Sequence, residues 1–383
     1  MLKLMVIVVD VLSHIIKKGE FTRRYYNPGN LFDEVHILMT NNDRPDISAL
    51  QPTVGTAKLY LHNIPEPSLK RTLGYKPWLL NLWAKRAVTL AKKINPDMIR
   101  CHQNWLNGFL AYRIKKNTGI PYVVSLHTNP DEDIRKSLKN EQEIKFWNAM
   151  KIIENISLRN ADLALPVYQS IIPYIENMGM HNYEVAYNVL NPEFLGAKTD
   201  YTLHNPVRLI SVGRHFEGKN PENIIRAVRE LPDVHLTLVG DGPYQDYLQN
   251  IAHECKVENR VTFHRAIPNN ELCRQLPEYD IYVVHVESFG IAKAVLEPLL
   301  TGLPVIINRR REQPVPELQG DHVLLVENTP EGYYQGIKKL LTDPVFRENL
   351  GKRAYSLAQE KWAPARTEAK YVDIYKRILA KAK

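Results

Sequence analysis

A chain of 383 residues is long for a single hydrophobic core and suits two domains of ordinary size. Its apolar fraction of 44% and charged fraction of 24% are typical of a soluble globular protein and exclude a disordered or fibrous one. The three cysteines, Cys101, Cys255 and Cys273, cannot form a disulfide framework, which predicts a reducing, cytoplasmic environment.

The chain begins with an apolar run from Leu4 to Val9, which Asp10 interrupts. This run is too short for a membrane-spanning helix or for the apolar region of a signal peptide. We therefore interpret residues 1–12 as a buried first strand.

Short β-type runs alternate with helical stretches throughout the chain, which indicates parallel sheets joined by crossover helices. The runs of the first half are residues 2–11, 33–40, 57–64, 97–103, 122–128 and 161–167. Those of the second half are residues 207–213, 235–241, 260–267, 280–286, 303–309 and 322–328. We predict an α/β protein with two Rossmann-like domains facing across a cleft.

A polar stretch without periodicity, residues 196–205, is the predicted linker between the two domains. It leaves residues 1–195 as an N-terminal domain and residues 206–362 as a C-terminal domain. Residues 363–383 are rich in Ala, Lys, Arg and Tyr, which indicates a closing helix.

The net charge of +8 is unevenly distributed, since eleven basic residues and a single acid, Asp97, lie between Lys70 and Lys116. Trp78 and Trp83 are interleaved with them at helical spacing. Two interpretations stay open: peripheral contact with an anionic membrane at its inner face, and an amphipathic helix that docks on its own sheet. No nucleic-acid recognition motif accompanies the charge.

The segment from Glu287 to Ile306 holds two carboxylates, Glu287 and Glu297, around a turn at Phe289 and Gly290. Ionisable groups on both sides of a buried helix start are costly unless a ligand binds there. Glycine lets a backbone approach that ligand, and the amino terminus of the following helix favours an anion. A nucleoside diphosphate fits this pattern.

Other candidates follow the predicted strands, where ligands bind in open α/β sheets. Arg214 and Lys219 lie at a strand-to-helix turn, where an arginine and a lysine can hold a diphosphate; the alternative is a pair of solvated loop cations. Gly240 belongs to a turn of small residues, which alone is more often simple punctuation. The backbone at Arg265 and Ala266 is placed to meet a flat base.

In the first half, His127 follows a strand directly, where a structural and a functional histidine are equally expected. The stretch 13–20 is expected to form a loop after the first strand, with Gly19 its one glycine. This loop is either a phosphate or acceptor contact or a plain surface loop.

Taken in order, these segments resemble the family 4 glycosyltransferases, which are retaining enzymes of the GT-B fold that use nucleotide-sugar donors. The likeness is close in SVGRHFEGKN, LVGDGP, RVTFHRAIP and residues 287–306, and looser in KKGE, FDEVHIL, SLHTNP, ADLALPV and YNVLNPEF. It spans nearly the whole chain. The resemblance implies that the closing helix crosses back to the N-terminal domain.

The resemblance also implies roles for the candidates. Arg214 and Lys219 would hold the donor diphosphate, and Glu297 the ribose hydroxyls. His127 would lie against the transferred sugar. The remaining donor contacts would come from Glu287, Phe289, Gly290, Ile291, Lys293, Gly19, Gly240, Arg265 and Ala266. The family needs neither a bound metal nor a cofactor beyond the UDP- or GDP-linked sugar.

One departure from the family concerns the spacing of the two glutamates, which have nine residues between them where the family has seven. Either the helix entry holds an insertion, or Phe289 takes the position of the first glutamate and Lys293 becomes a phosphate or sugar contact. Glu297 keeps its role in both alignments. Pro298 fits more easily if the helix begins late. The first loop also lacks the double glycine of many relatives.

The predicted function is retaining transfer of a sugar to a hydroxyl of a glycan, lipid-linked or other acceptor, in polysaccharide or glycoconjugate assembly. A nucleotide-sugar epimerase or hydrolase of the same architecture would need further acid/base residues at the sugar. An inactive nucleotide-sugar-binding or scaffolding protein is the non-enzymatic alternative, which the stretched glutamate spacing keeps open.

Overall fold

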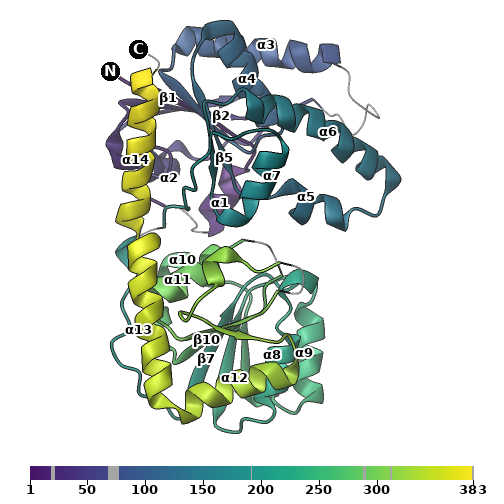
Figure 1. Cartoon of the computed structure of the whole chain (residues 1–383), viewed down its shortest axis with the longest axis vertical. Coiled ribbons are helices and arrows are strands. Elements are labelled where there is room, and N and C mark those ends of the chain that lie inside the picture. The colour runs from purple at the N-terminus through teal and green to yellow at the C-terminus, as the bar shows by residue number, and fades with distance from the viewer. Residues whose placement is uncertain (19–21, 68–76, 191, 288–289, 311–312, 382–383) are drawn as a thin grey trace. The chain divides into compact units, whose positions relative to one another are not determined.

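The computed structural model describes residues 1–18, 22–67, 77–190, 192–287, 290–310 and 313–381 (Figure 1). Gly19, Phe289 and Lys70, three residues of the sequence predictions, lie outside these ranges. The chain divides into an N-terminal unit, residues 1–189 and 367–383, and a C-terminal unit, residues 190–366.

The N-terminal unit is built around a six-stranded parallel sheet with the order β3-β2-β1-β4-β5-β6. Its strands are β1 (Lys3–Val8), β2 (Glu34–Met39), β3 (Lys58–Asn63), β4 (Met98–His102), β5 (Tyr122–Leu126) and β6 (Leu163–Pro166). Its helices are α1 (Leu12–Lys18), α2 (Ile47–Leu50), α3 (Pro77–Ile94), α4 (Leu106–Thr118), α5 (Pro130–Asp133), α6 (Glu141–Arg159) and α7 (Ile172–Asn177). Short 3-10 turns are η1 (Pro28–Asn30), η2 (Gln51–Val54), η4 (Arg135–Ser137) and η5 (Gln169–Ile171).

The C-terminal unit repeats this plan with a second parallel sheet, in the order β12-β11-β10-β7-β8-β9. Its strands are β7 (Val207–Val212), β8 (Val234–Val239), β9 (Val261–His264), β10 (Ile281–Val284), β11 (Val305–Asn308) and β12 (Leu324–Val326). Its helices are α8 (Glu222–Val228), α9 (Gln245–Glu254), α10 (Asn269–Gln275), α11 (Lys293–Thr301), α12 (Pro330–Thr342) and α13 (Pro344–Lys361). Its 3-10 turns are η6 (Pro192–Phe194), η7 (Glu217–Lys219), η8 (Glu258–Arg260), η9 (Leu276–Glu278) and η10 (Pro316–Leu318).

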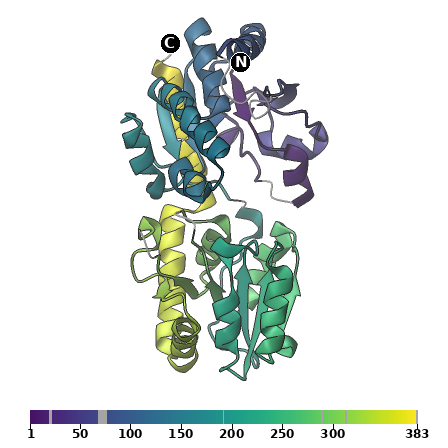
Figure 2. The ribbon, with the colours of Figure 1, turned by 90° about the vertical axis from the view of Figure 1, so that its right-hand side faces the viewer.

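Both sheets are buried by helices on their two faces, as parallel sheets require. In the C-terminal unit, α13 lies on one side of the strands and α8 and α9 on the other, in both views of the ribbon (Figures 1 and 2). Strands β7, β8 and β10 contribute apolar side chains to one core with α8, α9 and α12. Each predicted strand run contains one observed strand, so the predicted fold class is confirmed.

The last helix, α14 (Pro364–Lys381), completes the core of the N-terminal unit. Its side chains Tyr371, Ile374 and Tyr375 are buried among residues of β1 and β2. The Tyr371 hydroxyl donates to the Ala186 carbonyl oxygen at 2.9 Å. The predicted closing helix therefore exists, and it supplies apolar surface that the N-terminal sheet needs.

The two units meet at residues 189/190 and 366/367, whereas the predicted linker spans residues 196–205 and the predicted closing helix begins at residue 363. Residues 196–205 group with the C-terminal unit, where the Lys198 N–H donates to the Thr301 carbonyl oxygen at 2.7 Å. The Tyr201 hydroxyl donates to the Gly302 carbonyl oxygen at 3.0 Å. A segment without periodicity can still be fixed by tertiary hydrogen bonds.

The expected loop at residues 13–20 is wrong over its first part, because Leu12–Lys18 form α1. Leu12, Ile15 and Ile16 have the spacing of a helical apolar face and pack against the core of the unit. The Ser13 N–H also donates to the Asp43 carboxylate at 2.9 Å and anchors the first turn.

Helix α3 carries Trp78 and Trp83 of the basic stretch and docks on its own unit. Trp83 is buried and donates its indole N–H to the Ile64 carbonyl oxygen at 3.1 Å, while Leu80 is also buried. Trp78 and Leu82 are 63% and 55% exposed on the opposite face. Among the described residues, no helix has the length and apolar character needed to cross a bilayer.

Candidate functional site

The candidate site of the C-terminal unit lies where β7 and β10 end. These two strands are neighbours in the sheet, although β8 and β9 come between them in the chain. The connections leave β7 and β10 toward opposite sides at this point, and a crevice for ligands forms there in open α/β sheets. A small pocket at this position is lined by residues of both strands together with His215, Lys219 and His285.

Two of the predicted cations, Arg214 and Lys219, come together after β7. Arg214 is exposed, and its guanidinium lies over the Phe216 ring at 5.2 Å. Lys219 ends η7 and is partly buried. Burial, and then the charges of Arg214 and Arg310, lower the pKa of Lys219. The structure therefore gathers positive charge at the carboxyl ends of the strands of this sheet.

Arg310 is a third cation of this cluster, which the sequence predictions missed. It follows β11, the neighbour of β10, and its three guanidinium nitrogens are buried. Its charge acts on Lys219 and also on the Tyr333 phenol. The signal was present in the sequence, because Arg310 comes two residues after a strand end, as Arg214 does.

The turn at Gly240 has a structural role beyond ending β8, because it lets two loops pack closely. A side chain at Gly240 would clash with the carbonyl oxygen of Gly213, and one at Gly242 with that of His215. The His215 N–H donates to the Asp241 carbonyl oxygen at 3.0 Å, which joins the two loops. These glycines let the loops after β7 and β8 approach each other and fix the backbone beside Arg214.

Arg265 and Ala266 lie after β9 and are both exposed. The Arg265 guanidinium is 74% exposed and lies 3.9 Å from the Asp241 carboxylate. The Gly240 N–H donates to the carbonyl oxygen of His264 at 2.8 Å. This end of β9 therefore borders the Gly240 turn.

Glu287 is tied to three other segments of the site. Its Oε1 accepts from the Asn308 amide at 3.0 Å and lies 2.8 Å from His285 Nε2. Its backbone N–H donates to the Gly218 carbonyl oxygen at 2.9 Å, beside Lys219. His285 Nδ1 accepts from the Asn220 N–H, so Nε2 carries the proton that is donated to Glu287.

These bonds show what Glu287 does in the free protein. One oxygen of its carboxylate is committed to holding the ends of β10 and β11 beside the η7 turn. The side chain is still 37% exposed. His285 and Asn308, the partners of Glu287, were not singled out from the sequence, although each lies at a strand end.

Helix α11 begins at Lys293, after Gly290 and Ile291, which are buried. Its N-cap residue, Ala292, has no side-chain acceptor for the first N–H groups. These donors and the helix dipole favour an anion at this end. The late start at Lys293 also agrees with the expectation drawn from Pro298.

Glu297 is 4% exposed and lies on the buried face of α11. Its Oε1 accepts from the Asn269 amide of α10 at 3.0 Å. Burial and the Glu297 charge raise the pKa of the Cys273 thiol to about 12. Asn269 was missed by the sequence predictions, because only the packing of α10 against α11 brings it to Glu297.

His127 lies in the N-terminal unit, directly after β5. Its ring is 5.1 Å from that of His102. Burial, and then the Arg100 charge, lower the pKa of His127 to about 3, so the imidazole is neutral at pH 7. Its Nε2 is buried and has no hydrogen-bond partner within the described ranges. A neutral imidazole of this kind is available to bind a hydroxyl.

Within the residues that the structure describes, no group of three or more His, Cys, Asp or Glu side chains is arranged to hold a metal ion.

Two family models match this chain, one in each half. The model described as "Glycosyltransferase Family 4" matches residues 31–194, and the model described as "Glycosyl transferases group 1" matches residues 200–357.

Curated relatives resemble both halves at moderate identity. An uncharacterized glycosyltransferase of Methanocaldococcus jannaschii is 25% identical over 302 residues, which cover 73% of this chain and 75% of the relative. The sulfoquinovosyl transferase of Arabidopsis thaliana is 25% identical over 353 residues, or 88% of this chain and 66% of the relative.

Solved structures share the two-unit architecture. Sucrose-phosphate synthase from Thermosynechococcus elongatus is similar over 100% of both chains, with a TM-score of 0.73 and 15% identity. The Anabaena protein HepE, solved with UDP-glucose, covers 98% of this chain and 100% of its own, with a TM-score of 0.70 and 15% identity. A Listeria monocytogenes structure titled as a putative UDP-N-acetylglucosamine 2-epimerase has a TM-score of 0.64 at 14% identity, over 99% of this chain and 97% of its own.

Proposed function

We propose that this chain, which belongs to the family 4 glycosyltransferases of the GT-B fold, transfers a hexosyl-type sugar from a nucleoside diphosphate to a hydroxyl acceptor with retention. The donor binds the C-terminal unit, and the acceptor is a glycan or a lipid-linked glycan. This assignment is favoured over the epimerase alternative because both family models are those of glycosyltransferases.

The observation that carries the proposal is the cluster of three cations at the carboxyl ends of the strands, where the turn that holds Lys219 bonds to the backbone of Glu287. Lys219 lies near enough to Arg214 and Arg310 for their charges to lower its pKa. Like charges held together in a partly buried site favour binding of an anion that relieves their repulsion. A diphosphate supplies that charge, and Arg forks and a Lys ammonium are the groups that bind it.

The remaining donor contacts follow from the same geometry. Glu297, held by Asn269, is proposed to accept from the ribose hydroxyls, and the exposed residue Ala266 is proposed to border the base. Gly290, Ile291 and Lys293 lead into the helix start and are proposed to meet the donor phosphate. The side chain of Glu287 is 37% exposed and is proposed to contact the donor sugar.

In the proposed reaction, the anomeric carbon of the donor forms a bond with the acceptor oxygen, and its bond to the phosphate oxygen breaks. The acceptor proton moves to the departing phosphate on the same face. The cations stabilise the charge that develops on the diphosphate, which is the work that a metal ion does in other transferases. Neutral His127 is proposed to hydrogen-bond the transferred sugar.

A thermal-shift series tests the donor site. Because a ligand that binds only the native state stabilises it, UDP, GDP or ADP should raise the melting temperature, and the matching sugar nucleotide should do so as well. The base that gives the largest shift identifies the donor. If none of the three shifts the melting temperature, the donor-site proposal is wrong.

We also propose that the exposed face of α3 contacts an anionic membrane. Trp78 and Leu82 lie one helical turn apart and are exposed, and Lys85 and Arg86 are exposed next to them. An exposed indole and leucine flanked by cations suit the boundary between acyl chains and anionic headgroups.

Flotation with vesicles of phosphatidylglycerol and phosphatidylcholine tests this contact at low salt. Trp78→Ala with Leu82→Ala should reduce the bound fraction severalfold, and added salt should release the protein. The matched control is Tyr355→Ala, which removes another exposed large side chain in the C-terminal unit. Equal vesicle binding by the Trp78→Ala, Leu82→Ala variant and the wild type would show that this face of α3 does not make the membrane contact.

A further inference from the structure

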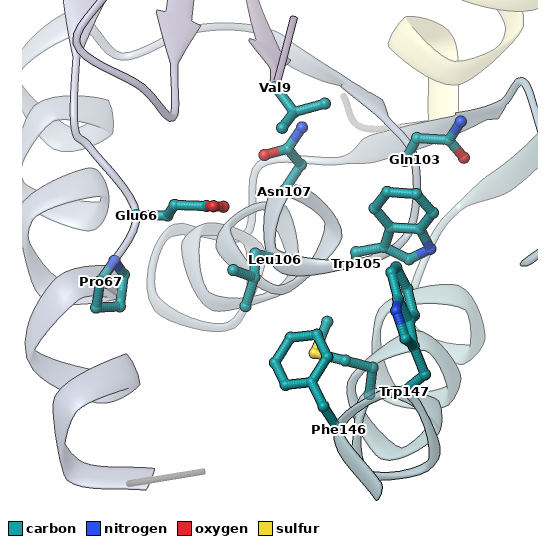
Figure 3. A pocket seen from close by; sticks show the side chains of 10 residues that line it. Val9, Glu66, Pro67, Gln103, Trp105, Leu106, Asn107, Phe146 and Trp147 are labelled. Carbon is teal, nitrogen blue, oxygen red and sulfur yellow. The ribbon is translucent and has the colours of Figure 1, made fainter. Parts of the chain in front are cut away.

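The N-terminal unit has its own cavity, of about 320 Å³, at the carboxyl end of its sheet (Figure 3). Val9 follows β1, Glu66 and Pro67 come after β3, and Gln103 and Trp105 follow β4. Strands β1 and β4 are neighbours from opposite halves of this sheet, so the cavity lies at its switch point. Its volume is in the range of small-molecule sites.

Aromatic rings form one wall of this cavity. The indoles of Trp105 and Trp147 lie edge to face with their centroids 5.1 Å apart, and Phe146 meets Trp147 in the same way at 5.8 Å. Leu106 extends the apolar surface at the start of α4 (Figure 3). Broad apolar faces of this kind pack against flat or ring-shaped ligands.

Hydrogen-bonding groups lie around this apolar wall. The Glu66 carboxylate points toward the cavity from the opposite side (Figure 3). The side-chain oxygen of Gln103 is buried and, among the described residues, accepts no hydrogen bond. The indole N–H of Trp105 is likewise buried without a described acceptor. A ligand hydroxyl both donates and accepts, so it can satisfy an acceptor and a donor of this set.

The wall is held in place by a buried polar network. Arg135 donates to the Trp147 carbonyl oxygen at 2.9 Å and to the Glu154 carboxylate at 2.7 Å. The Tyr174 hydroxyl donates to the same carboxylate at 2.7 Å and accepts from the Asn104 amide, also at 2.7 Å. Gln103 itself has φ of 67°, an unusual conformation for this residue. Such support and backbone strain are typical of a site prepared for a ligand.

We propose that this cavity binds a saccharide ring, with its C–H face against Trp147 and Trp105 and its hydroxyls at Glu66 and Gln103. A pyranose combines an apolar face with a rim of hydroxyls, which matches one aromatic wall and a polar opposite side. An alkyl chain would leave the Glu66 carboxylate and the Gln103 oxygen without donors. If the proposed transferase function holds, this sugar is the acceptor residue, so the acceptor is a glycan.

Saturation-transfer NMR on the full chain tests the site with methyl α-glucoside, methyl α-mannoside, methyl α-galactoside and n-octanol as probes, each with and without UDP and GDP. At least one glycoside should receive saturation on its ring C–H protons. Trp147→Ala and Glu66→Gln should each weaken its affinity about tenfold, since each removes an interaction of roughly 1.4 kcal/mol. Trp147→Phe keeps the packing of α6 and should give a smaller loss.

The matched control is Trp78→Ala, which removes an exposed indole of the same unit outside the cavity and should leave sugar binding unchanged. Binding of n-octanol with no glycoside bound would assign the cavity to a lipid chain and overturn the proposal. Glycoside binding that Trp147→Ala and Glu66→Gln leave intact, or no binding of any probe, would overturn it as well.

The same preparation separates this proposal from the donor site. Lys219→Ala should abolish the thermal shift by nucleoside diphosphates and leave glycoside binding in the N-terminal unit intact. A bound glycoside without any nucleotide shift would remove the proposed donor function and retain the saccharide site. A thermal shift by a nucleoside diphosphate without glycoside binding would retain the proposed donor site and overturn the saccharide site.

Discussion

The two units of this protein share one topology and differ in the chemistry at the carboxyl ends of their strands. In the order of their own strands, both sheets run 3-2-1-4-5-6. At the switch point of the C-terminal unit stand Arg214, Lys219 and Arg310, whereas that of the N-terminal unit holds indoles, a carboxylate and amides. The same scaffold thus presents a cluster of cations in one unit and an aromatic wall flanked by polar groups in the other.

The two units also complete their cores differently. The C-terminal unit covers its sheet with helices from one continuous stretch of chain, whereas the N-terminal unit depends on α14 from the far end of the chain. Its integrity therefore requires a contact between residues more than 180 positions apart, such as Tyr371 with Ala186.

The largest expected effect tests this dependence on α14. Ile374→Ala removes a fully buried side chain and should lower the unfolding free energy of the N-terminal unit by about 2–5 kcal/mol. Chemical denaturation followed by tryptophan fluorescence measures the loss. Lys376→Ala, on the exposed face of the same helix, is the control. An unfolding curve unchanged in Ile374→Ala would show that the N-terminal core does not need α14.

The charge cluster is the feature that most distinguishes the C-terminal unit. Lys219→Ala should lower turnover by about 10²–10³-fold, because it removes a preorganised charge from the departing diphosphate. Lys338→Ala, an exposed lysine of α12, should leave turnover unchanged. Kinetics with the sugar nucleotide chosen by thermal shift provide the measurement. Wild-type turnover in Lys219→Ala would place the phosphate contact at other residues.

The two glutamates of the C-terminal unit should separate in their effects. Glu297→Gln should weaken nucleotide affinity about tenfold, since a neutral amide accepts more weakly from the ribose hydroxyls. Glu287→Gln should change nucleotide affinity less, because its carboxylate bonds to His285 and Asn308. Isothermal titration calorimetry compares them, and equal losses in the two variants would contradict the assignment of the ribose to Glu297.

The smallest expected effect concerns the N-terminal unit alone. His127 is neutral in the folded protein because burial and the Arg100 charge lower its pKa to about 3, below its usual value near 6.5. The unfolded chain therefore binds one more proton between these values. This group contributes stability that is present above about pH 6.5 and is lost as the pH falls toward 3.

Between pH 7 and 5.5, this loss amounts to about 1 kcal/mol for His127. His127→Gln should flatten the pH dependence of the unfolding free energy by that amount, measured by denaturation at each pH. His181→Gln, which changes an exposed histidine of the same unit, should leave the slope as it is. A slope unaltered by His127→Gln would mean that the imidazole already takes up a proton in the folded state.

Local patterns predicted most of the fold. Apolar runs located all twelve strands of the described residues, because a parallel strand buried between helix layers requires near-continuous apolar residues. Gly302 located the end of α11, where it adopts the left-handed conformation that favours glycine. The predictions failed at α1, where a helical apolar spacing was interpreted as a loop. They were also silent on how residues 196–205 pack.

The candidate site was predictable only in part. Arg214, Lys219, Glu287 and Glu297 stand out because each follows a strand or flanks a turn in the sequence. Their partners Asn269, Asn308 and Arg310 do not stand out in the sequence. They reach the site only through packing between elements that are distant in the chain.

The sequence by itself determined the alternation of strands and helices, the two-unit plan and the positions of the candidate site residues after the strands, because these depend on neighbours within a few residues. Only the tertiary structure decided which strand ends meet. The order of strands in each sheet brings Lys219 to Arg310, and it assembles Glu66, Gln103 and Trp147 around one cavity. Contacts at long sequence separation follow from that order and from the packing of helices on it, which no local pattern encodes.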